Sequence, residues 1–180
     1  MPKTRADEQL TADAKRALRR LASAVSVVTC RADGRNYAMT ASSVSALSMD
    51  PPSMLVCVNR SAGFHNALDR AEAFAINILS RSQVAVSRAC SGVASGESRF
   101  RTGDWDISGA APTLIGAQAA IVCRKEKETR YGTHTVFMGP ILSVLAVGDV
   151  DPLVYLDGGY AARPLDGLVA IELSETWYLL

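Results

Sequence analysis

The sequence predicts an α+β domain, mainly β, in which an antiparallel sheet forms the core and only a few short helices accompany it. Short runs of apolar and β-branched residues recur along the chain, turn-forming residues separate these runs, and helical spacing is confined to short segments. With 180 residues, of which 48% are hydrophobic, the chain is long enough to bury one core. We expect about six or seven strands, closed into a barrel.

The first part of the chain combines one helical segment with an extended hairpin. Apolar residues recur at helical spacing from Leu10 to Leu21 among basic residues, which predicts a short amphipathic helix that serves for docking. From Ala24 to Ser48 the chain is extended, and Asp33-Gly34 supplies turn chemistry between two runs. Asp50-Pro51-Pro52 ends the second run, because proline cannot donate a hydrogen bond to a strand ladder.

The middle of the chain alternates strands with short helices. The continuous apolar run Met54 to Val58 predicts a strand that is buried on both faces. Ser61 is a candidate N-cap for a helix that continues to Arg70. We then expect a strand over Ala73–Leu79, a helix over Ser82–Ala89, and a long loop over Ser91–Gly109 that carries Arg99, Phe100, Arg101 and Trp105. Loops of this length in compact domains often have a function, although Phe100 and Trp105 are expected mainly in core or interface packing.

The last part of the chain is again extended. Strands are predicted over Ala117–Glu128 and His134–Val147, with a turn at Arg130–Gly132 between them. Alternating charges from Arg124 to Arg130 place one face of this region in solvent. Two short strands, Leu153–Leu156 and Leu168–Leu173, complete the domain. The chain thus divides into an N-terminal helical segment, residues 1–22, and a sheet domain, residues 23–180.

Composition and charge exclude several classes of function. The chain has 19 Lys and Arg against 18 Asp and Glu, so it has no basic excess that would neutralise nucleic-acid phosphates. Aromatic residues make up only 6%, too few for a base-stacking platform. No apolar run reaches the roughly 20 residues that span a bilayer, and the polar N-terminus has no secretory signal. The first twenty residues stand apart, with a net charge of +3.

The cysteines and histidines predict neither a metal site nor a familiar hydrolase. The four cysteines are widely spaced, without a C-x-x-C pair, and each lies in or beside an apolar segment: Cys30, Cys57, Cys90 and Cys123. We therefore expect buried free thiols in a reducing cytoplasm. With only His65 and His134 present and no G-x-S-x-G motif, a serine hydrolase is a weak hypothesis. The absence of a G-x-G-x-x-G fingerprint and of a P-loop removes a Rossmann dinucleotide site and an ordinary NTPase.

Two polar segments indicate a ligand. Hydroxyls crowd into the predicted strand from Met39 to Ser48, and buried hydroxyls need hydrogen-bond partners, which a polar ligand edge would supply. Asn59-Arg60-Ser61, followed by Phe64-His65-Asn66, stands where a strand meets a helix N-terminus, and such a junction suits a phosphate. Each segment alone is modest evidence, since serine-rich strands are often plain edge strands.

Taken together, in their order and spacing, these segments and several later ones are far more specific. They are Thr40-Ala41-Ser42-Ser43 through Ser48-Met49-Asp50-Pro51-Pro52, Leu55 to Ser61, Phe74 to Ser80, Gly132-Thr133-His134-Thr135 with Phe137-Met138-Gly139, Pro152 to Tyr155, and Gly159-Tyr160. From about Leu18 to Arg163 the chain resembles the small NAD(P)H:flavin oxidoreductases, the reductase partners of two-component flavin monooxygenases. The resemblance implies an FMN-binding split β-barrel that binds FMN or FAD and works as a homodimer, with the flavin near the subunit interface.

The resemblance also implies roles for individual residues. The flavin-contacting positions of the family correspond to Met39, Thr40, Ala41, Ser42, Ser43 and Ser48, and in a second region to Cys57, Val58, Asn59, Arg60, Ser61, Phe64 and His65. The catalytic position beside the nicotinamide, the histidine of a Gly-Asp-His turn, corresponds to His134, and Gly159-Tyr160 corresponds to a segment of the same cleft. The chain departs from the family pattern at Ser23-Ala24 in place of Thr-Gly, at Thr133 in place of the Asp, and at Cys90 in place of an aromatic residue.

A function follows from the resemblance. The nicotinamide would stack on the flavin and pass a hydride directly, so the protein would supply orientation and no nucleophile. We therefore expect an enzyme that uses NADH or NADPH to reduce free FMN or FAD for a separate flavin-dependent monooxygenase. Two alternatives stay open: a flavoprotein with tightly bound FMN that acts on its own substrate or as a redox sensor, and a non-catalytic dimer whose basic N-terminal helix docks on a partner protein.

Overall fold

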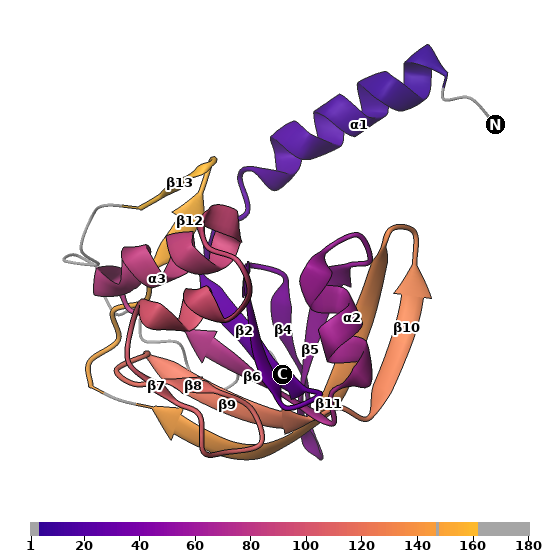
Figure 1. Ribbon diagram of the computed structural model, residues 1–180. Helices are drawn as coiled ribbons and strands as arrows, with labels where there is room; N and C mark the ends of the chain where they lie inside the picture. Colours follow the sequence, from indigo (N-terminus) through magenta and orange to yellow (C-terminus); the bar gives the residue numbers. More distant parts are fainter. Residues whose placement is uncertain (1–3, 147, 162–180) are drawn as a thin grey trace.

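Eight antiparallel strands form the main sheet of the computed structural model, which describes residues 4–146 and 148–161 (Figure 1). The order of the strands is β3-β2-β6-β9-β11-β5-β4, and β10 also pairs with β11. Their bounds are β2 Ser26–Ala32, β3 Arg35–Ala41, β4 Val44–Met49, β5 Pro52–Asn59, β6 Ala73–Ile78, β9 Ala119–Arg124, β10 Lys127–Tyr131 and β11 His134–Ala146. The predicted α+β class, mainly β, is confirmed.

Short helices and two small sheets surround the main sheet. The helices are α1 Arg5–Leu18, α2 Gly63–Arg70 and α3 Val84–Arg88, with 3-10 turns at Arg81–Gln83 and Gly96–Arg101 and a π-helical turn at Ala89–Val93. The small sheets are β1-β12-β13 and β7-β8, with bounds β1 Ser23–Ala24, β7 Trp105–Asp106, β8 Thr113–Leu114, β12 Val154–Leu156 and β13 Gly159–Tyr160. The predicted strand Leu168–Leu173 lies outside the described residues.

The expectation of a sheet closed into a barrel is wrong for the described residues. β3 and β4 stand at the two ends of the strand order and do not pair with each other. Only Ser42 and Ser43 separate these end strands along the chain, so the sheet curls until its two ends meet at this corner. Here the chain passes from the β2–β3 hairpin to the β4–β5 hairpin, and the facing edges of β3 and β4 share no ladder.

Local sequence signals predicted the β2–β3 hairpin correctly but placed the N-cap of α2 at the wrong residue. The hairpin turns at Asp33 and Gly34, both with positive φ, as the Asp-Gly pair predicted. The predicted N-cap Ser61 is wrong, because α2 begins at Gly63 after Ala62. The Ser61 hydroxyl instead donates to Asn59 Oδ1 at 3.0 Å, inside the preceding turn.

Two burial predictions also need correction. In β5, Val56 and Val58 are buried but Leu55 and Cys57, on the opposite face, are only half-buried, because no described element covers that outer face. The helix α1 buries none of its residues and projects from the domain, as Figure 1 shows, so it does not dock on this chain. The base of α1 is nevertheless held, since the Arg19 guanidinium lies 2.9 Å from Asp157.

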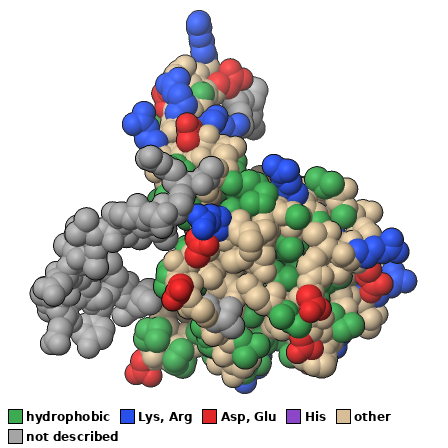
Figure 2. All heavy atoms as spheres, turned by 90° about the vertical axis from the view of Figure 1, so that its left-hand side faces the viewer, with side chains coloured by type: hydrophobic (Ala, Val, Ile, Leu, Met, Phe, Trp, Pro, Cys, Tyr) green, Lys and Arg blue, Asp and Glu red, His purple; other side chains and the backbone are tan. Residues whose placement is uncertain are grey.

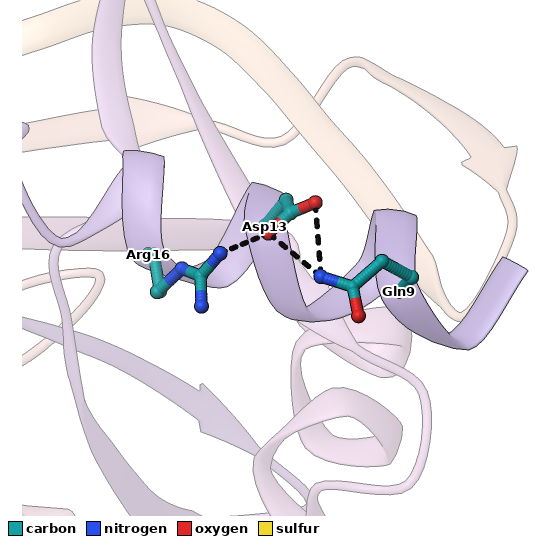
Figure 3. A network of polar contacts seen from close by, with 3 residues as sticks. All are labelled: Gln9, Asp13 and Arg16. Carbon is teal, nitrogen blue, oxygen red and sulfur yellow. Dashed lines mark hydrogen bonds and ion pairs between the residues drawn. The ribbon is translucent and has the colours of Figure 1, made fainter. Parts of the chain in front are cut away.

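Polar contacts within α1 stabilise it without tertiary packing. Thr4 and Asp7 form a capping box at its start, and Asp13 accepts hydrogen bonds from Gln9 and Arg16 (Figure 3). Figure 2 shows Lys and Arg side chains gathered over this helix, above the rest of the domain. Within the described ranges, no helix is both long and apolar enough to cross a membrane.

The core lies on both sides of β2 and β6. One apolar cluster, with Phe64, Phe74 and Phe137, fills the inside of the curled sheet beneath α2. A second apolar cluster lies under α3 and includes Val86. Phe100 and Trp105 pack against this cluster. The rings of Phe100 and Trp105 meet edge to face at 5.1 Å, so these two aromatic residues belong to core packing, as expected.

Candidate functional site

A cleft of about 600 Å³ lies between the second half of β3, the start of α2 and the turns that follow α3. β3 contributes Tyr37 to Thr40, and α2 contributes Ala62, Gly63 and Phe64. The third wall consists of Cys90, Ser91, Gly96 and Arg99. Met39, Thr40 and Phe64, three of the predicted flavin residues, thus line one cleft, while the third wall comes from the long loop region and the turn just before it.

The wall formed by α2 favours an anion. α2 begins without a side-chain cap, so N–H groups of its first turn remain available, and the helix dipole adds partial positive charge there. Its first residue is Gly63, and a Cβ placed on it would meet no atom within 4 Å, which leaves the backbone open to a ligand. These are the features that a phosphate-bearing ligand requires.

Arg99 supplies the positive charge on the opposite wall. Its Nε donates to the Ala94 carbonyl at 2.9 Å, and a second guanidinium nitrogen donates to the Ala38 carbonyl. An arginine has five N–H donors, so these two bonds fix the guanidinium and leave donors for a ligand. The sequence placed this charge on Arg60, but the structure brings Arg99 to the cleft.

Arg60 and its neighbours organise the turn that carries His134. The backbone N–H of Arg60 donates to the Thr133 carbonyl at 2.9 Å, and its guanidinium donates to the Gly132 carbonyl at 2.7 Å. Asn59 is the register partner of His134 between β5 and β11. His134 itself is exposed, with its Nδ1 2.9 Å from the hydroxyl of Thr133. Thr133, which stands where the family resemblance places an Asp, thus provides a hydrogen-bond partner for His134.

Thr40 and Tyr160 are predicted site residues far apart in the sequence, and both contact Ser87 of α3. The Thr40 hydroxyl donates to the Ser87 carbonyl at 2.7 Å, and the Ser87 hydroxyl lies 2.8 Å from the Tyr160 hydroxyl. Ser87 is fully buried. This contact holds β13, including Gly159, beside the helix that leads into the cleft.

The remaining predicted flavin residues do not share the cleft in a single chain. Ser42, Ser43 and Cys57 line a second hollow of about 480 Å³, and Ser48 lines a third of about 300 Å³. Ala41 and Val58 point into the core. His65 is buried, with Nε2 bonded to Thr135, and does not line the cleft.

Cys90, the cysteine that lines the cleft, is not an activated nucleophile. Burial raises the pKa of the Cys90 thiol to about 11, although nearby Arg99 opposes the shift, so this thiol stays protonated near neutral pH. No group of three His, Cys, Asp or Glu side chains in the described part of the chain is placed to hold a metal ion. The arrangement can bind and orient an anionic ligand.

Eight of the residues that line the cleft were not predicted as site residues from the sequence: Tyr37, Ala38, Ala62, Gly63, Cys90, Ser91, Gly96 and Arg99. The available signal was the loop after α3, whose length and arginines suggested a function. Its contact with β3 is long-range, and no local pattern specifies which strand such a loop will cover.

Comparison with known proteins identifies the family. Residues 18–163 match the family described as flavin reductase like domain. The chain is 40% identical over 156 residues to the reductase component of FADH(2)-dependent resorcinol hydroxylase from Rhizobium sp. (strain MTP-10005), covering 85% of this chain and 87% of that protein. It is 32% identical over 147 residues to the FMN reductase (NADH) RutF of Pantoea ananatis (strain LMG 20103), covering 81% and 77%.

A solved structure shows the same fold. The NADH:FAD oxidoreductase SgcE6 of Streptomyces globisporus C-1027, in complex with NAD and FAD fragments, superposes with a TM-score of 0.80 at 25% identity. The superposition covers 89% of this chain and 97% of SgcE6. Together with the family match over most of the chain, these similarities establish that the protein belongs to the flavin reductase like family.

Proposed function

We propose that this protein uses NADH or NADPH to reduce free FMN or FAD, and that the reduced flavin passes to a separate flavin-dependent monooxygenase. The relative at 40% identity is named as the reductase component of a hydroxylase, which supports the separate oxygenase. RutF is named as an NADH-dependent FMN reductase, and SgcE6 as an NADH:FAD oxidoreductase, which supports both flavins and the nicotinamide donor.

The cleft between β3 and α2 is the observation that carries this proposal. It pairs an uncapped helix start with Arg99 across a space of about 600 Å³, and its Cys90 thiol is protonated. Flavin and reduced nicotinamide, when bound, supply the hydride chemistry themselves. The role of the chain is then to bind the phosphate, expose backbone groups to the ring system, and orient the nicotinamide.

We further propose that the curled sheet is the split β-barrel of the family and that two copies of the chain form the working unit. The two-residue link between the end strands β3 and β4 supports the first point. The outer face of β5 and β11, where Leu55 is opposite Met138 and Cys57 opposite Val136, is apolar and only half-buried, which supports the second. A second copy would also complete a site whose predicted residues are divided among separate hollows.

We place the protein in the reducing cytoplasm. Its four cysteines are all free, and three of them are buried.

Turnover with defined cofactors tests the proposed function. Purified protein is mixed anaerobically with NADH or NADPH and with FMN, FAD or riboflavin, and the loss of reduced-nicotinamide absorbance is followed. We expect flavin-dependent oxidation, with flavin lost on gel filtration. Flavin that co-elutes with the protein, together with slow turnover, would instead favour a tightly bound flavin with its own substrate. No oxidation with any flavin would refute the proposal.

Replacing His134 with alanine is expected to weaken nicotinamide binding selectively. His134 is exposed beside Asn59, and the Thr133 hydroxyl lies 2.9 Å from its Nδ1, so Nε2 is the ring nitrogen assigned to the nicotinamide. Loss of one such hydrogen bond corresponds to about a tenfold rise in the KM for NAD(P)H. Flavin affinity, measured by fluorescence quenching, should stay unchanged. An equal loss of flavin and nicotinamide affinity would contradict the assigned role.

Removal of residues 1–20 separates catalysis from interaction through α1. Because α1 buries no residue in this chain, the truncated protein is expected to retain turnover within about twofold and to keep its fold. Arg19→Ala, which loses the contact with Asp157, is the control for the base of the helix. A truncated protein that is folded but inactive would show that α1 contributes to the active unit.

A further inference from the structure

His65 connects two parts of the molecule that carry predicted site residues. It is the third residue of α2 and directly follows Phe64, which lines the cleft. Its side chain is only 6% exposed, and its Nε2 lies 2.9 Å from the hydroxyl of Thr135. Thr135 is fully buried in β11 and directly follows His134. This bond therefore joins the first turn of α2 to the residue beside His134.

The surroundings of His65 hold the ring in place. Its imidazole packs against the buried ring of Phe137, with centroids 5.5 Å apart. Among the described residues Nδ1 has no hydrogen-bond partner, so the bond to Thr135 is the polar contact that orients the ring. A hydrogen bond buried in this way is costly to lose, because water cannot replace it.

The backbone on the other side of His134 is tied to the same junction. Arg60 binds the carbonyls of Gly132 and Thr133, and His134 itself is paired with Asn59. The residues before and after His134 are thus both bonded to the segment 59–65. A displacement of the start of α2 would move the start of β11 with it.

We propose, on the basis of the proposed function, that His65 is a positioning residue for nicotinamide oxidation. Its bond to Thr135 sets His134 at a constant position relative to the cleft wall formed by Ala62, Gly63 and Phe64. The cleft wall holds the flavin phosphate and His134 holds the nicotinamide, so this bond fixes one ligand against the other.

The substitution Thr135→Val removes the hydroxyl while preserving shape and β-branching. We expect the KM for NAD(P)H to rise about five- to tenfold, because small misplacements of a binding group are costly, while the FMN dissociation constant changes by less than about twofold. Thr135→Ser, which restores the hydroxyl, is expected to recover most of the wild-type KM. The matched control is Thr29→Val, which removes another fully buried, hydrogen-bonded threonine hydroxyl, on β2.

A double variant separates positioning from stability. Thr135→Val alone leaves the buried Nε2 of His65 unpartnered, whereas His65→Leu with Thr135→Val leaves no buried polar atom at the contact. The double variant is therefore expected to melt at a higher temperature than Thr135→Val and yet to keep the raised KM. Thr29→Val is expected to lower the melting temperature without a change in KM.

The KM values of these variants distinguish a positioning role of the His65–Thr135 bond from a purely structural one. A raised KM in the stable double variant, with recovery in Thr135→Ser, supports the positioning role. If the wild-type protein turns over but the double variant and Thr135→Val both keep a wild-type KM, the bond is structural only and the inference is wrong. Absence of wild-type turnover with every flavin overturns the proposed function, and the positioning role with it.

Discussion

Replacement of Gly139 with alanine is expected to prevent stable folding of the sheet. A Cβ placed on Gly139 would lie 1.6 Å from the carbonyl oxygen of Arg124 and 2.8 Å from its carbonyl carbon. Both atoms belong to the backbone where β9 passes into β10, and both strands pair with β11 at this point. Only a glycine allows so close an approach of two backbones.

The neighbouring backbone has little freedom to move away. Lys125 donates to the Glu72 carbonyl at 2.8 Å, and Glu126 donates to the Met138 carbonyl at 3.0 Å. Relief of the overlap would therefore break the bond to Glu72 beside β6 or the bond to Met138 in β11. We expect a loss of about 3 kcal/mol or more in the free energy of unfolding, measured by urea denaturation.

Gly109→Ala is the matched control for this variant. Its nearest contact would be the Ala111 carbonyl at 3.8 Å, an ordinary van der Waals distance. We expect its free energy of unfolding to stay within about 0.5 kcal/mol of wild type. A Gly139→Ala variant as stable as Gly109→Ala would contradict this prediction, because it would mean that the backbone between β9 and β10 can move aside without loss of stability.

Replacement of Arg99 with glutamine is expected to abolish the preference for a phosphorylated flavin. Arg99 faces the uncapped start of α2 across the cleft, and a charged hydrogen bond to phosphate contributes about 1.5–3 kcal/mol. The FMN dissociation constant should therefore rise about ten- to a hundredfold. Riboflavin, which lacks the phosphate, should bind wild type and variant equally, and fluorescence titration measures both.

Riboflavin also controls for damage to the cleft. Arg99 binds the carbonyls of Ala38 and Ala94, so its loss could deform the walls, and deformation would weaken riboflavin and FMN alike. Arg101→Gln, an exposed arginine at the end of the same 3-10 turn, is the matched charge control and should leave FMN affinity nearly unchanged. Equal weakening of both flavins by Arg99→Gln would mean that Arg99 is structural and that the phosphate binds elsewhere.

Short-range patterns predicted the turns of the fold, but the single extended run predicted up to Ser48 is in fact two strands, β3 and β4, at opposite ends of the main sheet. Asp33-Gly34 gave the β2–β3 hairpin because both positions must adopt positive φ, and Asp50-Pro51-Pro52 marked the boundary between β4 and β5. The boundaries failed where a side chain had a competing local partner. Ser61 bonds to Asn59 and so leaves the N-cap of α2 to Ala62.

The sequence indicated one part of the candidate site, and only the structure revealed another. The order of the motifs indicated His134, and the geometry places it beside Asn59, at a turn held by Arg60. The sequence could not show that Arg60 binds backbone carbonyls while Arg99 reaches the cleft. Either arginine is suitable for an anion by its chemistry, and only the path of the chain around β3 distinguishes them.

The sequence by itself determined the mainly-β class, the hairpin at Asp33-Gly34, the free thiols and the family. These follow from periodicity, turn residues and motif order, which act over a few residues or are preserved along the chain. Only the tertiary structure decided that the sheet stays open between β3 and β4, that α1 projects, and that His65 bonds to Thr135. Those features depend on contacts between residues far apart in the chain, and many pairings of similar segments satisfy the same local rules.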